Sequence, residues 1–399
     1  METQSPDTDR SEILILAPQP FFQERGTPIA VRLLTEELAD AGNKVDLLTY
    51  HEGLPFVYQG VSLHRTCSLP GLSGLKPGFS LKKIACDVLM LCKSISLIRK
   101  NQYRVLHAVE ESVFTALLLS VLFSIPFIYD MDSLLSLQLT DMFPLMGRCS
   151  GVLQWFEKKA MRRSKGIIAV CETLRETALR AAPSVPVAVL EDVSLIDSAD
   201  EDHPDDDIRR NSQIKGCLVM YVGNLEKYQG IDLLLESYTL LPQEQREKMS
   251  LVIIGGREED IAKYTQKSTA LGIKGRVHFL GQKPVKYLGY YLRQADILVS
   301  PRIQGNNTPM KLYSYLASGR PVIATNLPTH TQVLDDRIAL LSEPEPAAFM
   351  AALQTLGTNE ALRQQLGLAG AQRAEERYSR EAYRAKLRRF YLDTIGPPA

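Results

Sequence analysis

The stretch ILILAPQPFFQERGTPIAVRLLTEELADAGNKVDLLT, residues 13–49, indicates the fold. Residues 13–17 are a short, wholly apolar run, which is typical of a parallel strand buried on both faces. Residues 29–41 place apolar side chains at helical spacing, and Gly42 ends this predicted helix. A second apolar run, residues 45–49, predicts another strand. Together these segments predict one strand–helix–strand unit with a glycine-bearing loop after its first strand.

The same alternation of strands and helices continues outward to residue 190. The acidic segment DSADEDHPDDD, residues 197–207, is nearly devoid of apolar residues, which is typical of a solvated loop or linker. After it the alternation restarts with the apolar run CLVMYV, residues 217–222. The sequence therefore predicts an α/β protein with two doubly wound parallel sheets. We expect an N-terminal domain over 1–196, an acidic linker over 197–212, a C-terminal domain over 213–375 and a basic amphipathic helix over 376–399.

Composition limits the classes of function. The 399 residues contain 46 Lys plus Arg and 46 Asp plus Glu, and 45% of them are hydrophobic. This mixture suffices for two cores without disulfides or metals, and a zero net charge argues against bulk nucleic-acid binding. The first twelve residues are polar and acidic, so they do not form a signal peptide. We therefore expect a cytoplasmic protein.

The segment richest in chemically useful side chains is SPRIQGNNTPMKLYSYLASGRPVIATN, residues 300–326. Thr308 is a good N-cap, so we expect a helix over residues 308–318 whose N-terminus points to the carboxyl edge of a sheet. Such an N-terminus favours an anion. Lys311 in the first turn opposes the helix dipole, which a bound diphosphate would explain; the alternative is a solvated surface lysine. Arg302 lies just before this predicted helix.

Two other strand–helix loops contain glycines that would let the backbone approach an anionic ligand. One is YVGNLEKYQGID, residues 221–232, with Gly223 and Gly230; the other is ERGTP, residues 24–28, with Gly26. Neither is specific alone, because many such loops contain glycine and the dinucleotide fingerprint GxGxxG is absent.

A basic, strongly apolar stretch spans residues 76–104. It carries seven basic residues against the single acid Asp87, with leucines, isoleucines, Val88 and Met90 between them. Such a helix can lie on an anionic bilayer. It can equally be a packed domain helix with a solvated basic rim.

With these motifs in place, the chain resembles the family 4 glycosyltransferases, which have the GT-B fold of two facing Rossmann-like domains. The resemblance rests on GNLEKYQGIDLLLES, LVIIGG, VHFLGQ, ADILVSPR and, above all, TPMKLYSYLASGRPVIATN. It implies transfer of a sugar from a nucleotide-diphosphate donor to an acceptor with retention at the anomeric carbon. The C-terminal domain would bind the donor and the N-terminal domain the acceptor, and the final helix would pack back on the N-terminal domain.

The resemblance also implies the partners. The nucleotide sugar is a co-substrate, and no cofactor and no metal is expected, because protein cations would neutralise the leaving diphosphate. The acceptor would be a saccharide or a lipid-linked molecule of cell-envelope polysaccharide or glycolipid biosynthesis. This favours peripheral contact with the inner face of the cytoplasmic membrane through residues 76–104, and no nucleic acid.

The chain departs from the family pattern at several positions. The family usually carries two glutamates eight positions apart, which are Asn306 and Ser314 here. The usual arginine and lysine of the first donor loop are Asn224 and Gln229, and the usual histidine of the N-terminal domain falls at Asp132. The chain is therefore either a divergent enzyme or a non-catalytic sugar-nucleotide-binding homologue or partner subunit. A sugar-nucleotide 2-epimerase is a third hypothesis, although its chemistry needs more carboxylates.

Taking the chain as an active enzyme, we assign roles by this resemblance. Charge on the departing phosphate is stabilised by the catalytic Lys311 and Arg302 together with the donor-loop Lys227. The other expected donor-binding residues are Gly26, Gly223, Asn224, Asn307, Thr308 and Ser314. Asp132 is expected to orient the transferred sugar or the acceptor hydroxyl, although it can also be an ordinary N-cap. The expected acceptor-side residues are Thr27, Asp130 and His107, and for the histidine a plain polar loop residue is the alternative.

Overall fold

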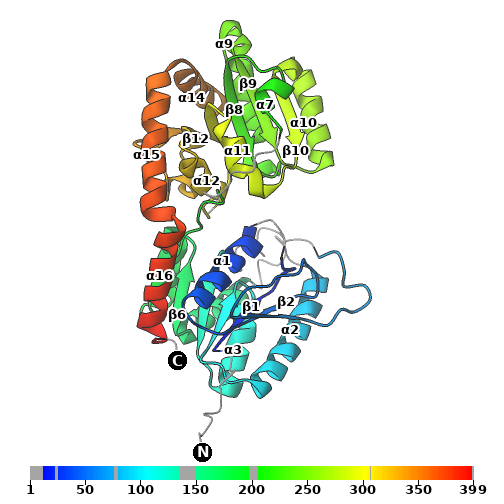
Figure 1. Cartoon of the computed structure of the whole chain (residues 1–399), viewed down its shortest axis with the longest axis vertical. Coiled ribbons are helices and arrows are strands. Elements are labelled where there is room, and N and C mark those ends of the chain that lie inside the picture. The colour runs from blue at the N-terminus through cyan, green and yellow to red at the C-terminus, as the bar shows by residue number, and fades with distance from the viewer. Residues whose placement is uncertain are drawn as a thin grey trace, which may run out of the picture. The chain divides into compact units, whose positions relative to one another are not determined.

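The computed structural model describes residues 12–22, 26–75, 80–134, 150–196, 205–305 and 307–397. The chain divides into two compact units (Figure 1). Unit 1 comprises Met1–Glu191 with Arg384–Ala399, and unit 2 comprises Asp192–Tyr383. Each unit is built around one parallel sheet, so the predicted α/β class with two doubly wound sheets is confirmed.

The sheet of unit 1 has the order β3-β2-β1-β4-β5-β6-β7, with every described pair parallel. Its strands are β1 (Ile13–Ala17), β2 (Val45–Thr49), β3 (Val61–Arg65), β4 (Val105–Val109), β5 (Phe127–Met131), β6 (Gly166–Ala169) and β7 (Val187–Val189). The central strands are short apolar runs buried on both faces, as helices on both sides of a parallel sheet require.

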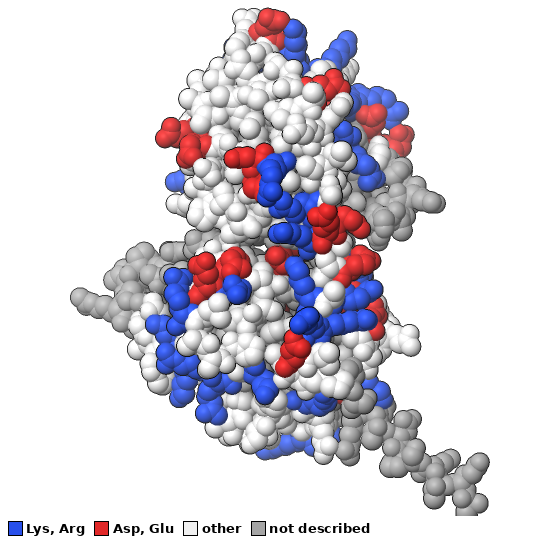
Figure 2. Space-filling view, turned by 90° about the vertical axis from the view of Figure 1, so that its left-hand side faces the viewer, with Lys and Arg blue, Asp and Glu red and all other residues white. Residues whose placement is uncertain are grey.

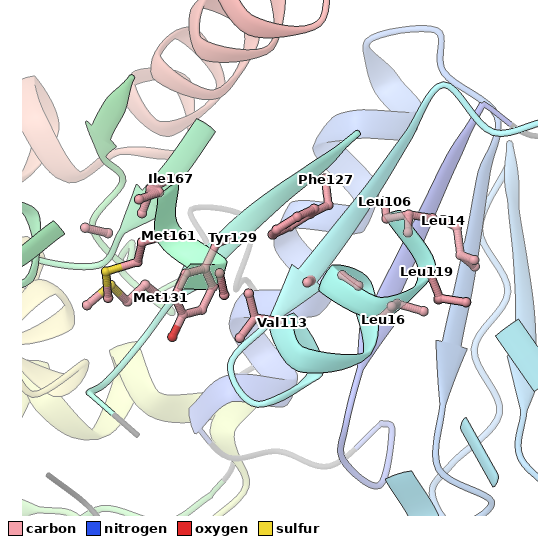
Figure 3. Packing of buried hydrophobic residues seen from close by; sticks show 14 of the residues in the cluster. Leu14, Leu16, Leu106, Val113, Leu119, Phe127, Tyr129, Met131, Met161 and Ile167 are labelled. Carbon is pink, nitrogen blue, oxygen red and sulfur yellow. The ribbon is translucent and has the colours of Figure 1, made fainter. Parts of the chain in front are cut away.

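One face of this sheet is covered by a layer of helices: α2 (Leu81–Lys100), α3 (Ser112–Phe123), α5 (Ser150–Arg163) and α6 (Glu172–Ala181). Their apolar residues pack on alternate side chains of the strands, among them Leu106, Phe127 and Tyr129 (Figure 3). The side chain of Ser80 caps α2 by accepting from the backbone N–H of Lys83 at 3.2 Å.

The other face carries α1 (Gly26–Asp40) and most of α16 (Arg380–Thr394). The guanidinium of Arg384 donates to the buried carboxylate of Glu37 at 2.6 Å, which joins the two helices. The ring of Phe390 lies so close to Gly166 that a Cβ there would be 2.7 Å from it. Residues of α16 from Arg384 onward therefore complete the core of unit 1.

The sheet of unit 2 has the order β10-β9-β8-β11-β12-β13, again parallel. Its strands are β8 (Cys217–Val222), β9 (Met249–Ile254), β10 (Val277–Gly281), β11 (Ile297–Ser300), β12 (Val322–Thr325) and β13 (Leu340–Ser342). Its α-helices are α7 (Ile208–Asn211), α8 (Ile231–Leu240), α9 (Gln243–Glu247), α10 (Glu258–Ala270), α11 (Leu288–Arg293), α12 (Lys311–Ala317), α13 (Pro328–Thr331), α14 (Pro346–Thr358) and α15 (Glu360–Tyr378). Short 3₁₀ turns are η2 (Lys227–Gln229), η3 (Lys274–Arg276) and η4 (Val285–Tyr287).

The acidic segment before unit 2 is partly built into that unit. Asp207 caps α7, and Asp206 accepts from Lys283 at 2.7 Å and from Tyr291 at 3.1 Å. Residues 205–211 therefore belong to unit 2, although their composition favours a linker, because the acids have partners that composition does not reveal. Unit 2 also includes residues 192–196, which we placed in the N-terminal domain. Residues 197–204 lie outside the described residues.

Candidate functional site

The carboxyl ends of β8, β9, β11 and β12 bring several loops together at one edge of unit 2. The backbone N–H of Ile303 donates to the carbonyl of Tyr228 at 2.9 Å, which joins the loop after β11 to the loop after β8. At Gly230 a Cβ would lie 1.8 Å from the carbonyl oxygen of Pro301. Such an edge is where ligands bind in open α/β sheets.

Lys311 is the cation at the centre of this edge. Its Nζ donates to Oε1 of Gln229 at 3.0 Å and lies 3.9 Å from the ring centroid of Tyr221. A Cβ on Gly223 would be 3.2 Å from the same Nζ, so only glycine leaves this space open. Burial lowers the pKa of Lys311 well below its ordinary value, and the charge of Arg302 lowers it further. Within the described part of unit 2, no carboxylate lies within ion-pair distance of this amine, so an anion would be a fitting ligand.

Two residues that position Lys311 were not assigned roles from the sequence. Tyr221 is fully buried and donates its hydroxyl to the carbonyl of Asn224 at 2.6 Å, with its ring beneath the lysine. Gln229, which replaces the family's usual lysine, is the acceptor for Nζ. The sequence does not single out Tyr221, because an aromatic residue inside an apolar run is typical of a buried core position.

Arg302 is 8% exposed and is bound mainly by its own loop. Its Nε donates to the carbonyl of Gln304 at 2.7 Å, and its two terminal nitrogens donate to Asn307 O at 3.2 Å and Oδ1 at 3.3 Å. The guanidinium also lies 5.0 Å from the ring centroid of Tyr228. Arg302 thus organises the loop and adds positive charge near Lys311. Its phosphate contact stays a prediction.

The helix after this loop begins later than its sequence suggests. We expected a helix over 308–318 capped by Thr308, but α12 spans only Lys311–Ala317 and has no side-chain cap. Both Arg302 and Thr329 donate to the carbonyl of Asn307, which fixes the chain in a turn before the helix. The predicted helix start at Thr308 is therefore wrong, and the helix begins at Lys311. The hydroxyl of Thr308 is buried without a hydrogen-bond partner, and the residue is 5% exposed.

The other predicted donor residues of unit 2 differ in exposure. Ser314 is fully buried and accepts from the backbone N–H of Leu195 at 2.9 Å, so the structure places it in packing behind the site. Lys227, Asn224 and Asn307 are exposed on the two loops. Asn306 lies outside the described residues.

His330 lies beneath the loop in a closed hydrogen-bond network. Ser300 donates its hydroxyl to Nε2 at 2.9 Å, and Nδ1 donates to the carbonyl of Thr325 at 2.9 Å. Burial lowers the pKa of His330 from 6.5 to about 3, and the charges of Lys311 and Arg302 act in the same direction. His330 is therefore a neutral structural residue that supports the site.

This neutral histidine predicts acid sensitivity of unit 2. A pKa held below its unfolded value contributes stability that is present above pH 6.5 and is lost as the pH falls toward 3. Between pH 7 and 5 the loss from this group alone is about 2 kcal/mol. Urea denaturation of the full chain followed by circular dichroism should show it, and His330→Gln should reduce the pH dependence by that amount. An unchanged pH dependence in the variant would contradict the assignment.

In unit 1, two of the predicted acceptor-side residues, His107 and Asp130, lie on β4 and β5. His107 is fully buried; its Nε2 donates to Asp130 at 3.2 Å, and its Nδ1 accepts from the hydroxyl of Tyr391 at 2.7 Å. Asp132 follows β5 and is partly buried. Gly26 and Thr27 lie apart from these residues along the chain, at the start of α1.

A carboxyl group that we did not predict lies beside Asp130. Glu110 follows β4 with a left-handed φ of 47°, which is unusual for a residue other than glycine. Burial and the neighbouring Glu111 raise the pKa of Glu110 to about 8. The dipeptide Glu110–Glu111 directly after an apolar strand was the available signal. Among the described residues, no group of three or more His, Cys, Asp or Glu side chains is placed to hold a metal ion.

Comparison with known proteins agrees with this architecture. The family model of the glycosyl transferase 4-like domain matches residues 25–191, and that of the glycosyl transferases group 1 matches residues 204–373. The fold and the matched segments define a glycosyltransferase of the GT-B class. The chain belongs to the family 4 glycosyltransferases, as the sequence motifs indicated.

The individual relatives match this chain over only part of their length or at low sequence identity. The phosphatidyl-myo-inositol mannosyltransferase of Mycobacterium leprae is 31% identical over 44% of this chain and 46% of its own length. The chain thus matches about half the length of this curated relative. Sucrose-phosphate synthase of Thermosynechococcus elongatus shares the fold with a TM-score of 0.79 at 20% identity, covering 96% of this chain and 99% of that one. Anabaena HepE, solved in complex with UDP, has a TM-score of 0.73 at 14% identity, covering 96% of this chain and 100% of that one.

Proposed function

We propose that the protein is an active glycosyltransferase that moves a hexosyl residue from a nucleoside-diphosphate sugar to a saccharide or lipid-linked acceptor. Unit 2 would bind the donor, and the β4–β5 edge of unit 1 would bind the acceptor. The reaction would retain the anomeric configuration and need no metal, because Lys311 supplies a cation for the departing diphosphate.

One observation carries this proposal: the amine of Lys311 is buried beside Gly223 and contacts the neutral side chains of Gln229 and Tyr221. A bound diphosphate would compensate its charge, and Asn307 and Lys227 on the same loops would contact the donor from the exposed side. A protein that had lost its donor would gain nothing from keeping a buried, uncompensated cation, which costs free energy. This favours a protein that still binds its donor, as the proposed enzyme does.

The direct test is calorimetric titration of the full chain with UDP, GDP and ADP and with their sugar conjugates, without metal. Tight binding of one nucleotide family is expected, and it identifies the donor for turnover assays. Failure of all three to bind would contradict the donor site, and binding without turnover of the sugar conjugate would favour the non-catalytic alternative.

We also propose that the protein works at an anionic membrane surface, where a lipid-linked acceptor would be found. The outer surface of the α2, α3 and α5 layer carries eight exposed large apolar side chains, which we call the apolar face. These are Ile84, Val88, Leu118, Val121, Leu122, Val152, Trp155 and Phe156, each 43–61% exposed. Clusters of this kind commonly mark interaction sites.

The charges around the apolar face are basic. Those of α2 and α5 include Lys93, Arg99, Lys100, Lys158, Lys159, Arg162 and Arg163. The two acids of the same helices point inward: Asp87 accepts from Tyr50 at 2.5 Å, and Glu157 is 2% exposed. Figure 2 faces the side of unit 1 on which α16 lies in Figure 1, and it shows Lys and Arg with Asp and Glu among them. Two copies of the chain would repel each other at this face, because both carry positive charge there. An anionic lipid surface would complement that charge.

The apolar face extends the membrane contact that we predicted for residues 76–104, of which residues 76–79 lie outside the described residues. Within the described ranges, no helix combines the length and apolar character that crossing a bilayer requires. The proposed contact is therefore peripheral, through side chains that lie along the surface.

Trp155 allows a simple measurement, because it is the single tryptophan of the sequence. Its fluorescence should shift to the blue on addition of vesicles containing phosphatidylglycerol, but not with phosphatidylcholine alone, and the shift should weaken with salt. In vesicle sedimentation, Leu122→Ser with Phe156→Ser should reduce binding at least about tenfold. The matched control is Leu392→Ser, an exposed leucine on α16. Equal binding by the double variant and the control would contradict the proposal.

A further inference from the structure

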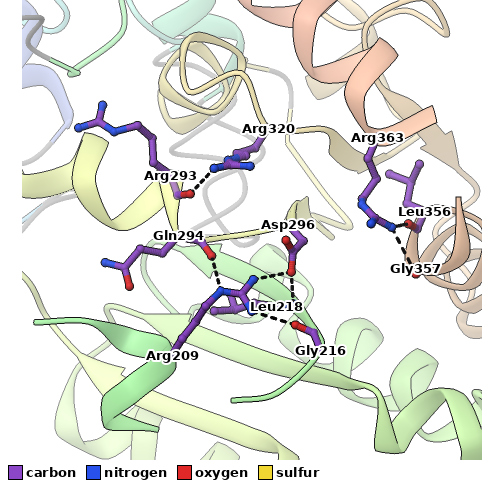
Figure 4. Close-up of polar contacts among 10 residues, drawn as sticks. All are labelled: Arg209, Gly216, Leu218, Arg293, Gln294, Asp296, Arg320, Leu356, Gly357 and Arg363. Atoms are coloured by element: carbon purple, nitrogen blue, oxygen red, sulfur yellow. Dashed lines mark hydrogen bonds and ion pairs between the residues drawn. The ribbon is translucent and has the colours of Figure 1, made fainter. Parts of the chain in front are cut away.

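Two arginines at the amino edge of the unit 2 sheet are held by partners within the protein (Figure 4). Arg209 donates to Asp296 at 2.5 Å, and Arg363 donates to the carbonyl of Leu356 at 2.6 Å. Charged groups that are satisfied in this way need no ligand. The two carboxyl groups that follow β4 in unit 1 are different, because they lie beside each other.

Glu110 and Glu111 lie where the connections of the unit 1 sheet change direction. In the order β3-β2-β1-β4-β5-β6-β7 the chain leaves β1 toward β2 and leaves β4 toward β5, on opposite sides. Ser112 joins the two strand ends, because its hydroxyl contacts the carbonyl oxygens of Leu16 at 2.9 Å and Val109 at 2.8 Å. Ligands of open α/β sheets bind outside the carboxyl ends of the strands at such a switch point.

The two carboxyl groups form a pair with one lysine beside it. Lys83, in the first turn of α2, forms an ion pair with Glu111, and these two side chains are 19% and 22% exposed. Glu110 lies within hydrogen-bonding reach of Glu111, and no ion pair joins it to another described residue. Burial and the charge of Glu111 raise the pKa of Glu110, as expected where two neighbouring carboxyl groups share one proton. The pair therefore offers both a hydrogen-bond donor and carboxylate acceptors.

A buried hydroxyl group near this pair lacks a partner. Tyr129 of β5 is fully buried, and within the described ranges its hydroxyl has no hydrogen-bond partner. Burial raises the pKa of Tyr129 well above its ordinary value, and the charges of Glu157, Glu110 and Glu111 act in the same direction. Figure 3 shows its ring next to Val113, whose backbone N–H donates to the carbonyl of Glu110 at 3.1 Å. A buried hydroxyl without a partner costs free energy, which a ligand held by the carboxyl pair would offset.

We propose that Glu110 and Glu111 bind hydroxyl groups of the sugar that accepts the transferred hexosyl residue, an inference that rests on the proposed function. Hydroxyl groups both donate and accept hydrogen bonds, so they match a carboxyl group beside a carboxylate. An anionic group would be repelled there, and Lys83 already supplies the cation that the carboxylate requires. The acceptor should therefore present neutral sugar hydroxyls, and not a phosphate, to the end of β4.

The test is sugar transfer by the full chain from the donor that the nucleotide titrations identify to three octyl glycosides: the α-mannoside, the β-glucoside and the β-galactoside. The wild type should use at least one of them. Glu110→Gln should lower kcat/KM for that glycoside by about 10- to 100-fold, mainly through a higher KM, because a hydrogen bond to a carboxyl group that carries or shares charge is lost. The calorimetric affinity for the nucleoside diphosphate should not change, since that ligand binds unit 2.

Glu110→Gly separates sugar binding from folding. Glu110 has a φ of 47°, which glycine adopts without strain, so this variant should keep or raise the thermal midpoint of the chain. It should still lose kcat/KM as Glu110→Gln does. The matched control is Glu172→Gln, because Glu172 is an exposed acid in the first turn of the helix that follows β6 at the same edge of the sheet. It should leave kcat/KM unchanged.

The outcomes distinguish this inference from the proposed function. Equal kcat/KM in the wild type, Glu110→Gln and Glu110→Gly overturns the inference and leaves the proposed function in place, and so does an equal loss in Glu172→Gln. Transfer to none of the three glycosides, with the donor still bound, overturns the sugar ligand. Absence of donor binding contradicts the proposed function itself, and this inference with it.

Discussion

Replacing Lys311 with methionine should lower the turnover of the nucleotide sugar by about 100- to 1000-fold and leave the fold intact. Methionine keeps the apolar stem over Tyr221 but removes the charge that would stabilise the departing diphosphate, and losses of this size follow removal of one such group. The measurement is kcat with the donor that the nucleotide titrations identify, together with the affinity for the nucleoside diphosphate. Near-normal turnover would remove Lys311 from the mechanism.

The Lys311→Met variant also allows an independent test, which measures the uptake of protons on ligand binding. Burial and the charge of Arg302 hold the pKa of Lys311 well below its ordinary value, so the amine of the free protein loses its proton at a lower pH than an exposed lysine does. A bound diphosphate favours the charged form, so binding should take up protons. Calorimetry in buffers of different ionisation enthalpy should show this uptake in the wild type and not in Lys311→Met. The exposed Lys227→Met is the matched control and should retain the uptake.

Replacing Gly230 with alanine should destabilise unit 2 by about 3 kcal/mol or more. Gly230 has a φ of 75°, and its new Cβ would lie 1.8 Å from the carbonyl oxygen of Pro301, so one of the two loops must move. Gly272→Ala separates the steric clash from the backbone strain. Its φ is 70°, but no atom lies within 4 Å of the new Cβ. That control should cost only about 1 kcal/mol, the penalty of the backbone conformation.

Urea denaturation followed by circular dichroism measures both variants. Because the loops after β8 and β11 also position Lys311, Gly230→Ala should weaken nucleotide binding as well, whereas Gly272→Ala should not. If the two variants had equal free energies of unfolding, the two loops could move apart without loss of stability. The close packing at Gly230 would then not be needed for nucleotide binding.

The fold could be predicted from the sequence because it depends on local patterns. Five-residue apolar runs such as Ile13–Ala17 are typical of strands buried on both faces, and their alternation with amphipathic segments leaves few topologies. The start of α12 could not be predicted in the same way. Thr308 and Pro309 form a good capping sequence, but hydrogen bonds from Arg302 and Thr329 to Asn307 decide the local backbone, and Thr329 is distant in the sequence.

The candidate site was predictable only in part. Lys311 was identified because a cation in a first helical turn requires an explanation, and the structure places it with neutral partners. For Arg302 the sequence could not show that its donors turn back to Gln304 and Asn307, and its phosphate contact stays a prediction. Glu110 was missed because its unusual pKa arises from burial, which depends on the packing of the complete unit.

The hydrogen bond between His107 and Tyr391 sets an order of events during synthesis. A ribosome releases the strands of unit 1 first, but Arg384, Phe390 and Tyr391 are synthesised only after the whole of unit 2. Until then Gly166 lacks its aromatic neighbour and Glu37 lacks its guanidinium. Unit 2 can thus complete its core before α16 is available to unit 1. The unit whose strands are synthesised first is therefore the unit whose core is completed last.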